Sequence, residues 1–82
     1  MPGDPVFDRV ESLLTENLAV AREKIRPEAD FRHDLGLDSF GAVELGFAVE
    51  EEFAIEVTDE EMASITTVGD LVEAVRKKLP SD

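Results

Sequence analysis

The sequence predicts an all-α protein, a small bundle of three main helices and one short helix. Apolar residues recur every three or four positions in three segments, which is the spacing of a buried helix face. Residues that cap helices stand just before these segments, and Pro80 ends the last of them. Only Ile55-Glu56-Val57 has the alternation of a short strand, and no neighbouring segment offers it a partner. Helices therefore account for nearly all the regular structure that we expect.

The first helix is predicted from about Pro5 to Leu18. Asp4 followed by Pro5 is typical of an N-cap and a first helical residue, because Pro has a helical φ and no N–H to leave unpaired. The apolar positions at helical spacing are Val6, Phe7, Val10, Leu13, Leu14 and Leu18. Residues 19–37 have only weak periodicity, so we expect a long connection with room for a short turn. A connection of this length in a compact domain is usually functional.

Asp38 is the predicted N-cap of a second helix, from Ser39 to about Phe53. One side of this helix forms a core-facing set, Ala42, Leu45, Val49 and Phe53. The roughly opposite side holds a second apolar set, Phe40, Val43 and Phe47, among the acids Glu44, Glu50 and Glu51. One small bundle cannot easily bury both sides of one helix. The second set therefore lines an interior pocket, forms an apolar patch left for partners, or packs against the long connection.

Two more helices are predicted near the C-terminus. The short one runs from Asp59 to about Ala63, with Thr58 as its cap. The last one follows Thr67, which stands three residues before Asp70 in the spacing of a capping box. Its apolar positions are Val68, Leu71, Val72, Val75 and Leu79, and the basic residues Lys77 and Lys78 suit the negative end of its dipole.

The chain has 82 residues, and we expect one domain over residues 1–82, ordered from about 5 to 79 with flexible termini. Such a domain buries only about 60% of its unfolded surface, which leaves little room for a deep catalytic cleft. The absence of cysteine excludes disulfides, a thiolate zinc site and a cysteine nucleophile, and it fits the cytoplasm. No segment approaches the ~20 apolar residues of a membrane span, and the N-terminus lacks the features of a signal peptide. We expect a cytoplasmic monomer that is not an enzyme.

Acidic residues outnumber basic ones by 20 to 8, for a formal net charge of −12. From His33 to Val75 there is no Lys or Arg, and twelve acids fall in that stretch. Such a surface repels nucleic-acid phosphates and anionic lipids, so we expect neither nucleic acid nor a membrane as a partner. It attracts proteins with basic docking surfaces to the middle of the chain. Solubility alone also explains a surplus of acids, but it explains less well so long a stretch without a base.

The pair Asp38-Ser39 places a hydroxyl at the first turn of the second predicted helix, just after the Gly36-Leu37 bend. A hydroxyl there is exposed, and the helix dipole and free amides favour a phosphate attached to it. On these two residues alone, however, a simple helix cap is the better explanation.

The residues around this pair, Asp34-Leu35-Gly36-Leu37-Asp38-Ser39-Phe40, closely resemble the phosphopantetheine attachment motif of acyl carrier proteins, where the Ser follows Gly-X-Asp. Further segments resemble the same family in order and spacing: Pro27 to Phe31, Val43 to Leu45, Glu50 to Phe53, and Ile65 to Asp70. The resemblance covers about residues 6–79, and several matches in series are far more specific than one short motif.

The resemblance implies that a phosphopantetheinyl transferase attaches the phosphopantetheine arm of coenzyme A to Ser39 through a phosphodiester, with Asp38 supporting the attachment. Fatty-acyl or polyketide intermediates would then be held as thioesters and presented to acyltransferases, ketosynthases and other synthase enzymes. The arm brings the thiol that this cysteine-free chain lacks. The family also suggests that the helices part to shelter an acyl chain. The residues implied to meet partners are Phe40, Val43, Glu44, Phe47, Glu50 and Glu51.

Four positions depart from the family pattern. Phe40 stands where Leu is usual, Gly41 where a polar residue is common, and Gly46-Phe47 where two larger aliphatic residues are common. Each helical Gly destabilises a helix by about 0.5–1 kcal/mol relative to Ala, so two in one helix suggest a purpose. Gly46 is a candidate for enlarging a chain-binding pocket. The departures leave open whether the carrier serves general fatty-acid synthesis or a specialised pathway.

Other functions fit less well. A serine hydrolase that uses Ser39 and His33 would lack the Gly-X-Ser-X-Gly elbow. Calcium loops counted from Asp30 or Asp34 place Gly41 or Leu45 where a bidentate Glu belongs, so we expect no specific metal site. A carrier of aminoacyl, D-alanyl or peptidyl cargo stays open, although peptidyl carriers more often show Gly-Gly-His/Asp-Ser. The remaining alternative is an acidic helical interaction module without a prosthetic group.

Overall fold

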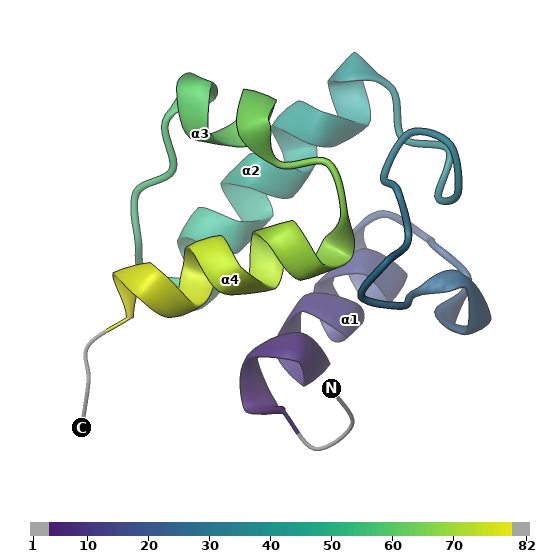
Figure 1. The fold of residues 1–82 in the computed structure, drawn as a ribbon, viewed down its shortest axis with the longest axis horizontal. Coiled ribbons are helices and arrows are strands. Elements are labelled where there is room, and N and C mark those ends of the chain that lie inside the picture. Colours follow the sequence, from purple (N-terminus) through teal and green to yellow (C-terminus); the bar gives the residue numbers. More distant parts are fainter. Residues whose placement is uncertain (1–3, 80–82) are drawn as a thin grey trace.

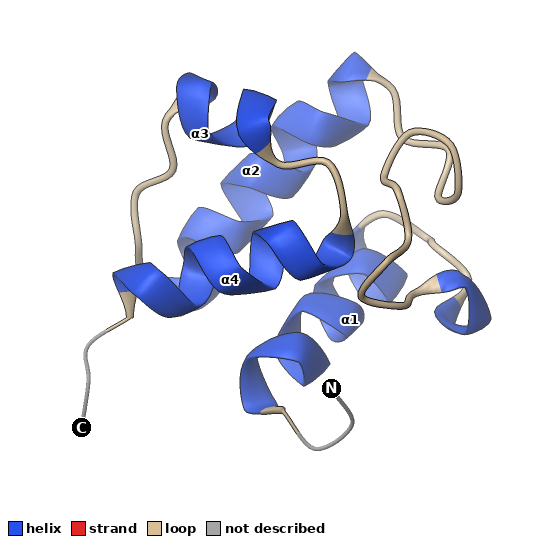
Figure 2. Cartoon of the chain, in the orientation of Figure 1, coloured by secondary structure: helices blue, strands red, loops and turns tan. Residues whose placement is uncertain are grey.

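The computed structural model describes residues 4–79. In that range the chain forms four α-helices and a short 3₁₀ turn (Figures 1 and 2): α1 (Pro5–Asn17), η1 (Arg22–Lys24), α2 (Ser39–Phe53), α3 (Asp59–Ser64) and α4 (Val68–Lys78). The predicted all-α bundle of three main helices and one short helix is confirmed. The expected flexibility of the termini concerns mainly residues 1–3 and 80–82, which lie outside the described residues.

Helix boundaries differ from the prediction only by a residue. α1 ends at Asn17, because Leu18 is its C-cap, and α3 continues to Ser64. The segment Ile55–Val57 forms no strand within residues 4–79. Its N–H groups bond to the end of α2 instead: Ile55 donates to the Glu50 carbonyl at 3.2 Å, and Val57 donates to the Glu50 carboxylate at 2.9 Å. These donors therefore need no strand partner.

Each helix begins at a side chain that caps it. Asp4 accepts a hydrogen bond from the Val6 N–H at 2.9 Å, and Asp38 accepts one from the Gly41 N–H at 2.9 Å. Thr58 and Thr67 each form a complete capping box, the second one with Asp70 as predicted. Such caps satisfy N–H groups that have no partner inside the helix, so they determine where the helix starts.

The two ends of the described chain are tied together. Asp4 forms an ion pair with Arg76 in the last turn of α4. Burial raises the pKa of Asp4, but hydrogen bonds from Arg76 and from the first amides of α1 outweigh it, and the pKa is lower than usual. The carboxylate therefore stabilises the fold in its charged form.

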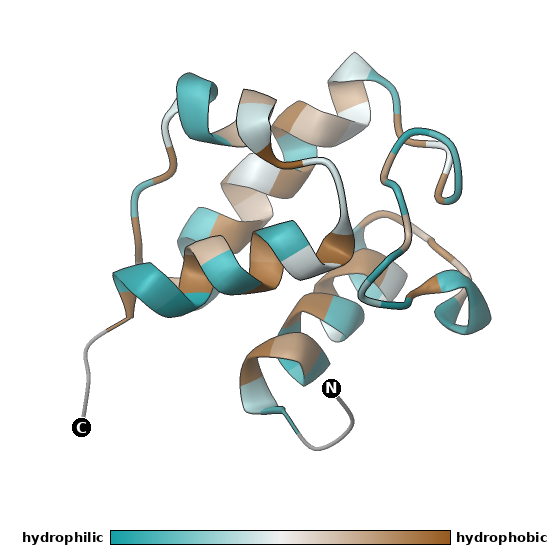
Figure 3. Cartoon of the chain, in the orientation of Figure 1, coloured by the Kyte–Doolittle hydropathy of each residue, from teal (hydrophilic) through white to brown (hydrophobic). Residues whose placement is uncertain are grey.

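The core lies where α1 meets α2 and α4. In Figure 3, apolar and polar residues alternate along α1 and α4, as expected of helices with one buried side, whereas α2 is pale or brown over most of its length. The predicted core side of α2 is confirmed for Leu45, Val49 and Phe53, and Ala42 is half-buried. The largest fully buried side chains are Leu14, Leu45, Leu71, Val10, Val49, Val68, Val72 and Val75.

The long connection between α1 and α2 packs against the start of α4. Its buried side chains include Ile25, Ala29 and Phe31. The Phe31 N–H donates to the Thr66 carbonyl at 3.0 Å, and an isolated bridge pairs Asp30 with Thr67. As expected, the connection contains a short turn, η1. These contacts hold the segment that leads into α2 in one place.

Candidate functional site

Ser39 is the first residue of α2 and is exposed. Asp38 precedes it as the N-cap, and its side chain is engaged with the Gly41 N–H. The first turn of α2 carries no acidic side chain. A negative group attached to the Ser39 hydroxyl would therefore lie at the positive end of a helix of 15 residues, next to the Asp38 carboxylate that caps this helix.

The loop before Ser39 is held by its own hydrogen bonds. Asp30 Oδ1 accepts from the N–H groups of Arg32 and His33 at 2.8 and 2.9 Å. The bond from the His33 N–H is the main reason that the pKa of Asp30 is lower than usual. Gly36 has a φ of +71°, which a residue with a side chain rarely adopts. The Leu37 N–H then donates to the Phe31 carbonyl at 2.8 Å, and the chain enters α2.

Gly41 allows the loop to close against the start of α2. A Cβ atom at this position would lie 3.0 Å from Leu37 Cδ2, which is closer than ordinary van der Waals contact. Without that atom, the Leu37 side chain packs against the first turn of α2. The structure thus supplies a reason for a glycine that is costly in a helix.

A cavity of about 460 Å³ opens between the loop, α2 and α3. This volume is in the range of sites that hold small molecules, about 300–1,000 Å³. Its apolar walls come mainly from Phe31, Leu37, Leu45, Gly46, Met62 and Ile65. Asp38, Ala42 and Val43, which flank Ser39 in sequence and on the helix, also line it. One end of the cavity therefore lies beside Ser39.

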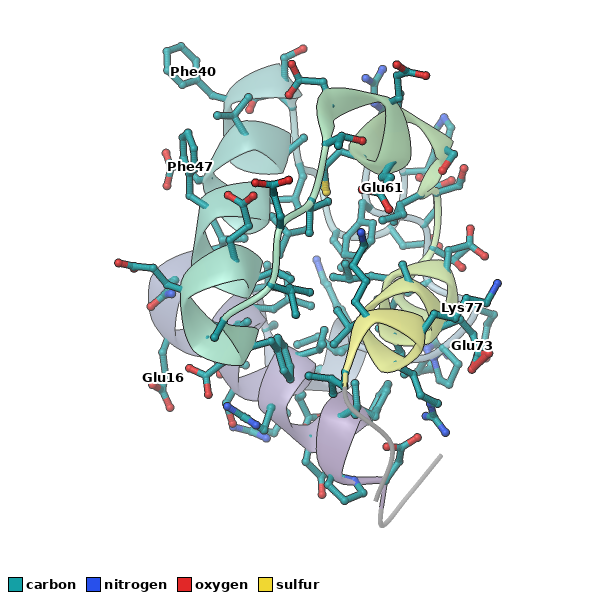
Figure 4. The ribbon with its side chains drawn as sticks, turned by 90° about the vertical axis from the view of Figure 1, so that its left-hand side faces the viewer. Glu16, Phe40, Phe47, Glu61, Glu73 and Lys77 are labelled. Atoms are coloured by element: carbon teal, nitrogen blue, oxygen red, sulfur yellow. The ribbon has the colours of Figure 1, made fainter. Side chains whose placement is uncertain are left out.

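The second apolar set on α2 is exposed: Phe40 by 80%, Val43 by 56% and Phe47 by 64%. Figure 4 shows Phe40 and Phe47 pointing outward from the same side of α2. One of the three interpretations of the sequence, that this set packs against the long connection, is therefore wrong. Val43 and Phe47 also border the cavity, so they contribute to both the surface and the pocket.

The three predicted docking acids differ in their surroundings. Glu44 and Glu51 are exposed on α2. Glu50 is only partly exposed, and its carboxylate accepts the Val57 N–H bond at 2.9 Å. The sequence alone does not signal this bond, because its partner lies beyond the end of the helix. Glu50 thus serves the fold, whatever else it does.

His33 and Ser39 do not form the pair that a serine hydrolase needs, because no hydrogen bond joins them among the described residues. His33 is exposed, and its ionic neighbour is Asp30, with 3.4 Å between His33 Nδ1 and Asp30 Oδ1. Within residues 4–79, no group of three or more His, Asp or Glu side chains is placed to hold a metal ion. In the same range, no helix is long and apolar enough to cross a membrane.

A family model described as "phosphopantetheine attachment site" matches residues 8–75. The chain belongs to this family. It is therefore a carrier of the acyl carrier protein type, and phosphopantetheine is its covalently attached prosthetic group. Carriers of this family work with a phosphopantetheinyl transferase and with synthase enzymes, and they are generally non-catalytic. The start of α2 fits such a group, since it combines an exposed hydroxyl, a helix N-terminus and an adjoining apolar cavity.

Proposed function

We propose that Ser39 is the attachment residue and that the protein carries fatty-acyl or polyketide intermediates as thioesters on its arm. The position of Ser39 supports this proposal: its exposed hydroxyl opens α2 directly beside an apolar cavity. The arm supplies length, flexibility and a terminal thiol. The protein supplies the anchor, the shelter for the cargo and the surface that partner enzymes bind.

In the loading step, Ser39 Oγ attacks the phosphorus atom that bears pantetheine in coenzyme A. A bond forms between this oxygen and phosphorus, the pyrophosphate bond breaks, and adenosine bisphosphate leaves, while the transferase accepts the Ser39 proton. Asp38 is a positioning residue, because its bond to the Gly41 N–H holds the first turn of α2 and with it Ser39. The amides and dipole at this helix end then favour the charge of the phosphodiester.

The cavity would shelter the cargo between visits to partner enzymes. Its walls are largely apolar, so burying an alkyl chain there is favourable by about 0.8 kcal/mol for each methylene group. A chain inside the cavity draws its thioester toward the protein and away from water. An aminoacyl cargo would gain less, because its charged amine is costly to bury. This difference favours acyl cargo over the aminoacyl alternative.

The outer side of α2 would be the docking surface. It combines the exposed apolar residues Phe40, Val43 and Phe47 with the exposed acids Glu44 and Glu51. Apolar anchors surrounded by charge are typical of the centre of an interface. The acids would attract the transferase, acyltransferases and ketosynthases through basic residues on those enzymes. Glu50 would contribute less, because its carboxylate is bonded to Val57.

The attachment is tested with coenzyme A, a promiscuous transferase and an intact-mass measurement. The wild-type protein should gain the mass of one arm, whereas Ser39→Ala should gain none and keep its helical circular dichroism. Ser64→Ala is the matched control: Ser64 is also exposed and at a helix end, and it should leave loading unchanged. Modification of Ser39→Ala would refute the assignment.

Docking is tested by charge reversal. Glu44→Lys combined with Glu51→Lys should slow phosphopantetheinylation about tenfold at low ionic strength, mainly through the association rate. Glu16→Lys combined with Glu23→Lys changes the net charge equally, but these exposed residues lie on α1 and η1 (Glu16 in Figure 4). Equal rates for the two double variants would show that the acids on α2 have no special role in docking.

A further inference from the structure

Arg32 carries a positive charge at the edge of an otherwise acidic part of the molecule. Among residues 4–79 it is the only Lys or Arg that lines the cavity beside Ser39. The sequence that follows, from residue 33 to residue 75, contains no Lys or Arg at all. His33 also lines the cavity, but its Nδ1 atom already lies 3.4 Å from an oxygen of Asp30. Arg32 therefore supplies the permanent positive charge at this end of the cavity.

The backbone holds Arg32 close to the start of α2. The Leu37 N–H donates to the Phe31 carbonyl at 2.8 Å. Arg32 directly follows Phe31, and Ser39 stands two residues after Leu37, so this hydrogen bond brings the two segments together. The Arg32 N–H in turn donates to Asp30 Oδ1 at 2.8 Å, which fixes the backbone from which the long Arg32 side chain extends.

The guanidinium group of Arg32 is available to a ligand. None of the ion pairs among residues 4–79 includes Arg32, although the loop around it is rich in acids. The carboxylates of this loop accept backbone N–H bonds instead. Asp34 Oδ2 accepts from the Asp30 N–H at 2.7 Å, and Asp38 Oδ1 accepts from the Gly41 N–H at 2.9 Å. The local acids thus stabilise the backbone of the loop and leave the Arg32 side chain unpaired.

A phosphodiester on Ser39 would bring negative charge to a place that already has some. The Asp38 carboxylate caps α2 directly before Ser39, and like charges so close repel each other. The amides at the helix end offset only part of this repulsion. A guanidinium group has a fixed charge and can donate two parallel N–H bonds to one phosphate. In the lining of the cavity only Arg32 has such donors.

We propose that Arg32 binds the phosphodiester of the prosthetic group and so holds the base of the arm at the mouth of the cavity. The proposal rests on the proposed function, since it places the arm on Ser39. Arg32 is a positioning residue: it offsets the charge of the phosphate and sets the direction in which the arm leaves α2. It has no part in the loading chemistry or in the thioester.

The first test follows the phosphodiester signal of the loaded protein by phosphorus NMR. Arg32→Gln should shift and narrow this signal, because the phosphate loses its partner and moves more freely. Arg26→Gln is the matched control, since Arg26 is exposed on the same connection, does not line the cavity and changes the net charge equally. It should leave the signal as in the wild type. Arg32→Lys should give an intermediate signal, because lysine keeps the charge but not the two parallel donors.

The second test needs neither the arm nor a transferase. Ser39→Glu places a carboxylate oxygen the same number of bonds beyond Cβ as a phosphate oxygen on serine. Its effect on the melting temperature is measured in the wild-type, Arg32→Gln and Arg26→Gln backgrounds. At low ionic strength the effect should be more favourable by about 1–4 °C wherever Arg32 is present, as expected for an exposed ion pair. Added sodium chloride should reduce this difference.

The two tests separate this proposal from the assignment of Ser39. Intact mass first shows whether Ser39 carries the arm. If it does, equal phosphorus signals in Arg32→Gln and Arg26→Gln would overturn the role of Arg32 and leave the proposed function intact. If it does not, the proposed function fails, and the Ser39→Glu comparison alone decides whether Arg32 forms an anion site. Equal effects of Ser39→Glu in all three backgrounds would then overturn that site.

Discussion

Phe40 tests most directly which side of α2 is buried in the core and which side is exposed. It follows Ser39 directly and is 80% exposed, whereas Phe53 at the other end of the helix is 6% exposed. The Phe53 ring also lies under the Arg9 guanidinium, 4.6 Å from its carbon to the ring centroid. Phe40→Ala and Phe53→Ala therefore remove the same atoms from opposite environments.

The magnitudes follow from these exposures. A buried aromatic side chain removes about 150–250 Å² from water, so the fifth of Phe40 that is covered amounts to about 40 Å² and about 1 kcal/mol. Truncation of Phe53 costs ~3–5 kcal/mol, because it also leaves a cavity. A domain of this size has a total stability of about 4–12 kcal/mol. Phe40→Ala should lower the melting temperature by about 4–8 °C, and Phe53→Ala by several times more.

The assay is a thermal melt of both variants followed by circular dichroism. Alongside it, acyl-transfer rates of Phe40→Leu are measured with ketosynthases from fatty-acid and polyketide pathways. We expect Phe40→Leu to melt like the wild type and to change the ratio of the two rates, because a ring offers partners more contact area than Leu. A melting temperature of Phe40→Ala as low as that of Phe53→Ala, with an unchanged ratio, would refute this reasoning and place Phe40 in the core.

Three further outcomes are expected. Because the net charge is −12, added sodium chloride should screen self-repulsion and raise the melting temperature by a few degrees; a salt-independent melt would contradict this. Gly69→Ala should lower the melting temperature, since its Cβ atom would lie 2.9 Å from the Pro27 carbonyl oxygen, whereas Gly46→Ala should raise it. The lowered pKa of Asp30 means that its carboxylate stabilises the fold above about pH 4 and loses this effect as the pH falls through the lowered value. The stability difference between wild type and Asp30→Ala, from urea midpoints, should therefore shrink between pH 7 and 3; a constant difference would count against this role.

The helices and their limits could be predicted because the signals that form them are local. Asp4, Asp38, Thr58 and Thr67 each accept a hydrogen bond from an amide two or three residues ahead, so the cap and its partner are visible in one short segment. The apolar periodicity within each helix is equally local. The attachment motif could be recognised for the same reason, since Asp38-Ser39 and the bend before it are contiguous in the chain.

The sequence alone left the second apolar side of α2 unresolved. Helical spacing showed that Phe40, Val43 and Phe47 share a side, but it could not say what covers that side. The structure shows that α2 packs against α1 through its other side, which carries the buried Leu45, Val49 and Phe53, and that these three residues are exposed. Glu50 shows the same limit: the family resemblance implied a docking role for it, whereas its bond to Val57 depends on how the chain turns after α2.

Gly41 and Gly46 show what the sequence determined by itself and what only the tertiary structure decided. Sequence and helix propensity identified Gly41 and Gly46 as costly, but gave the same cost for both. Only the fold distinguishes them, because a Cβ atom at Gly41 would lie 3.0 Å from Leu37 Cδ2, whereas one at Gly46 would make an ordinary contact with Met62 Cγ at 3.6 Å. Helix formation depends on neighbours within about four residues. The cap residues and the apolar spacing that specify each helix therefore lie within its own segment of the sequence. Cavities and exposed faces depend on segments far apart in the chain, which meet only when the helices pack.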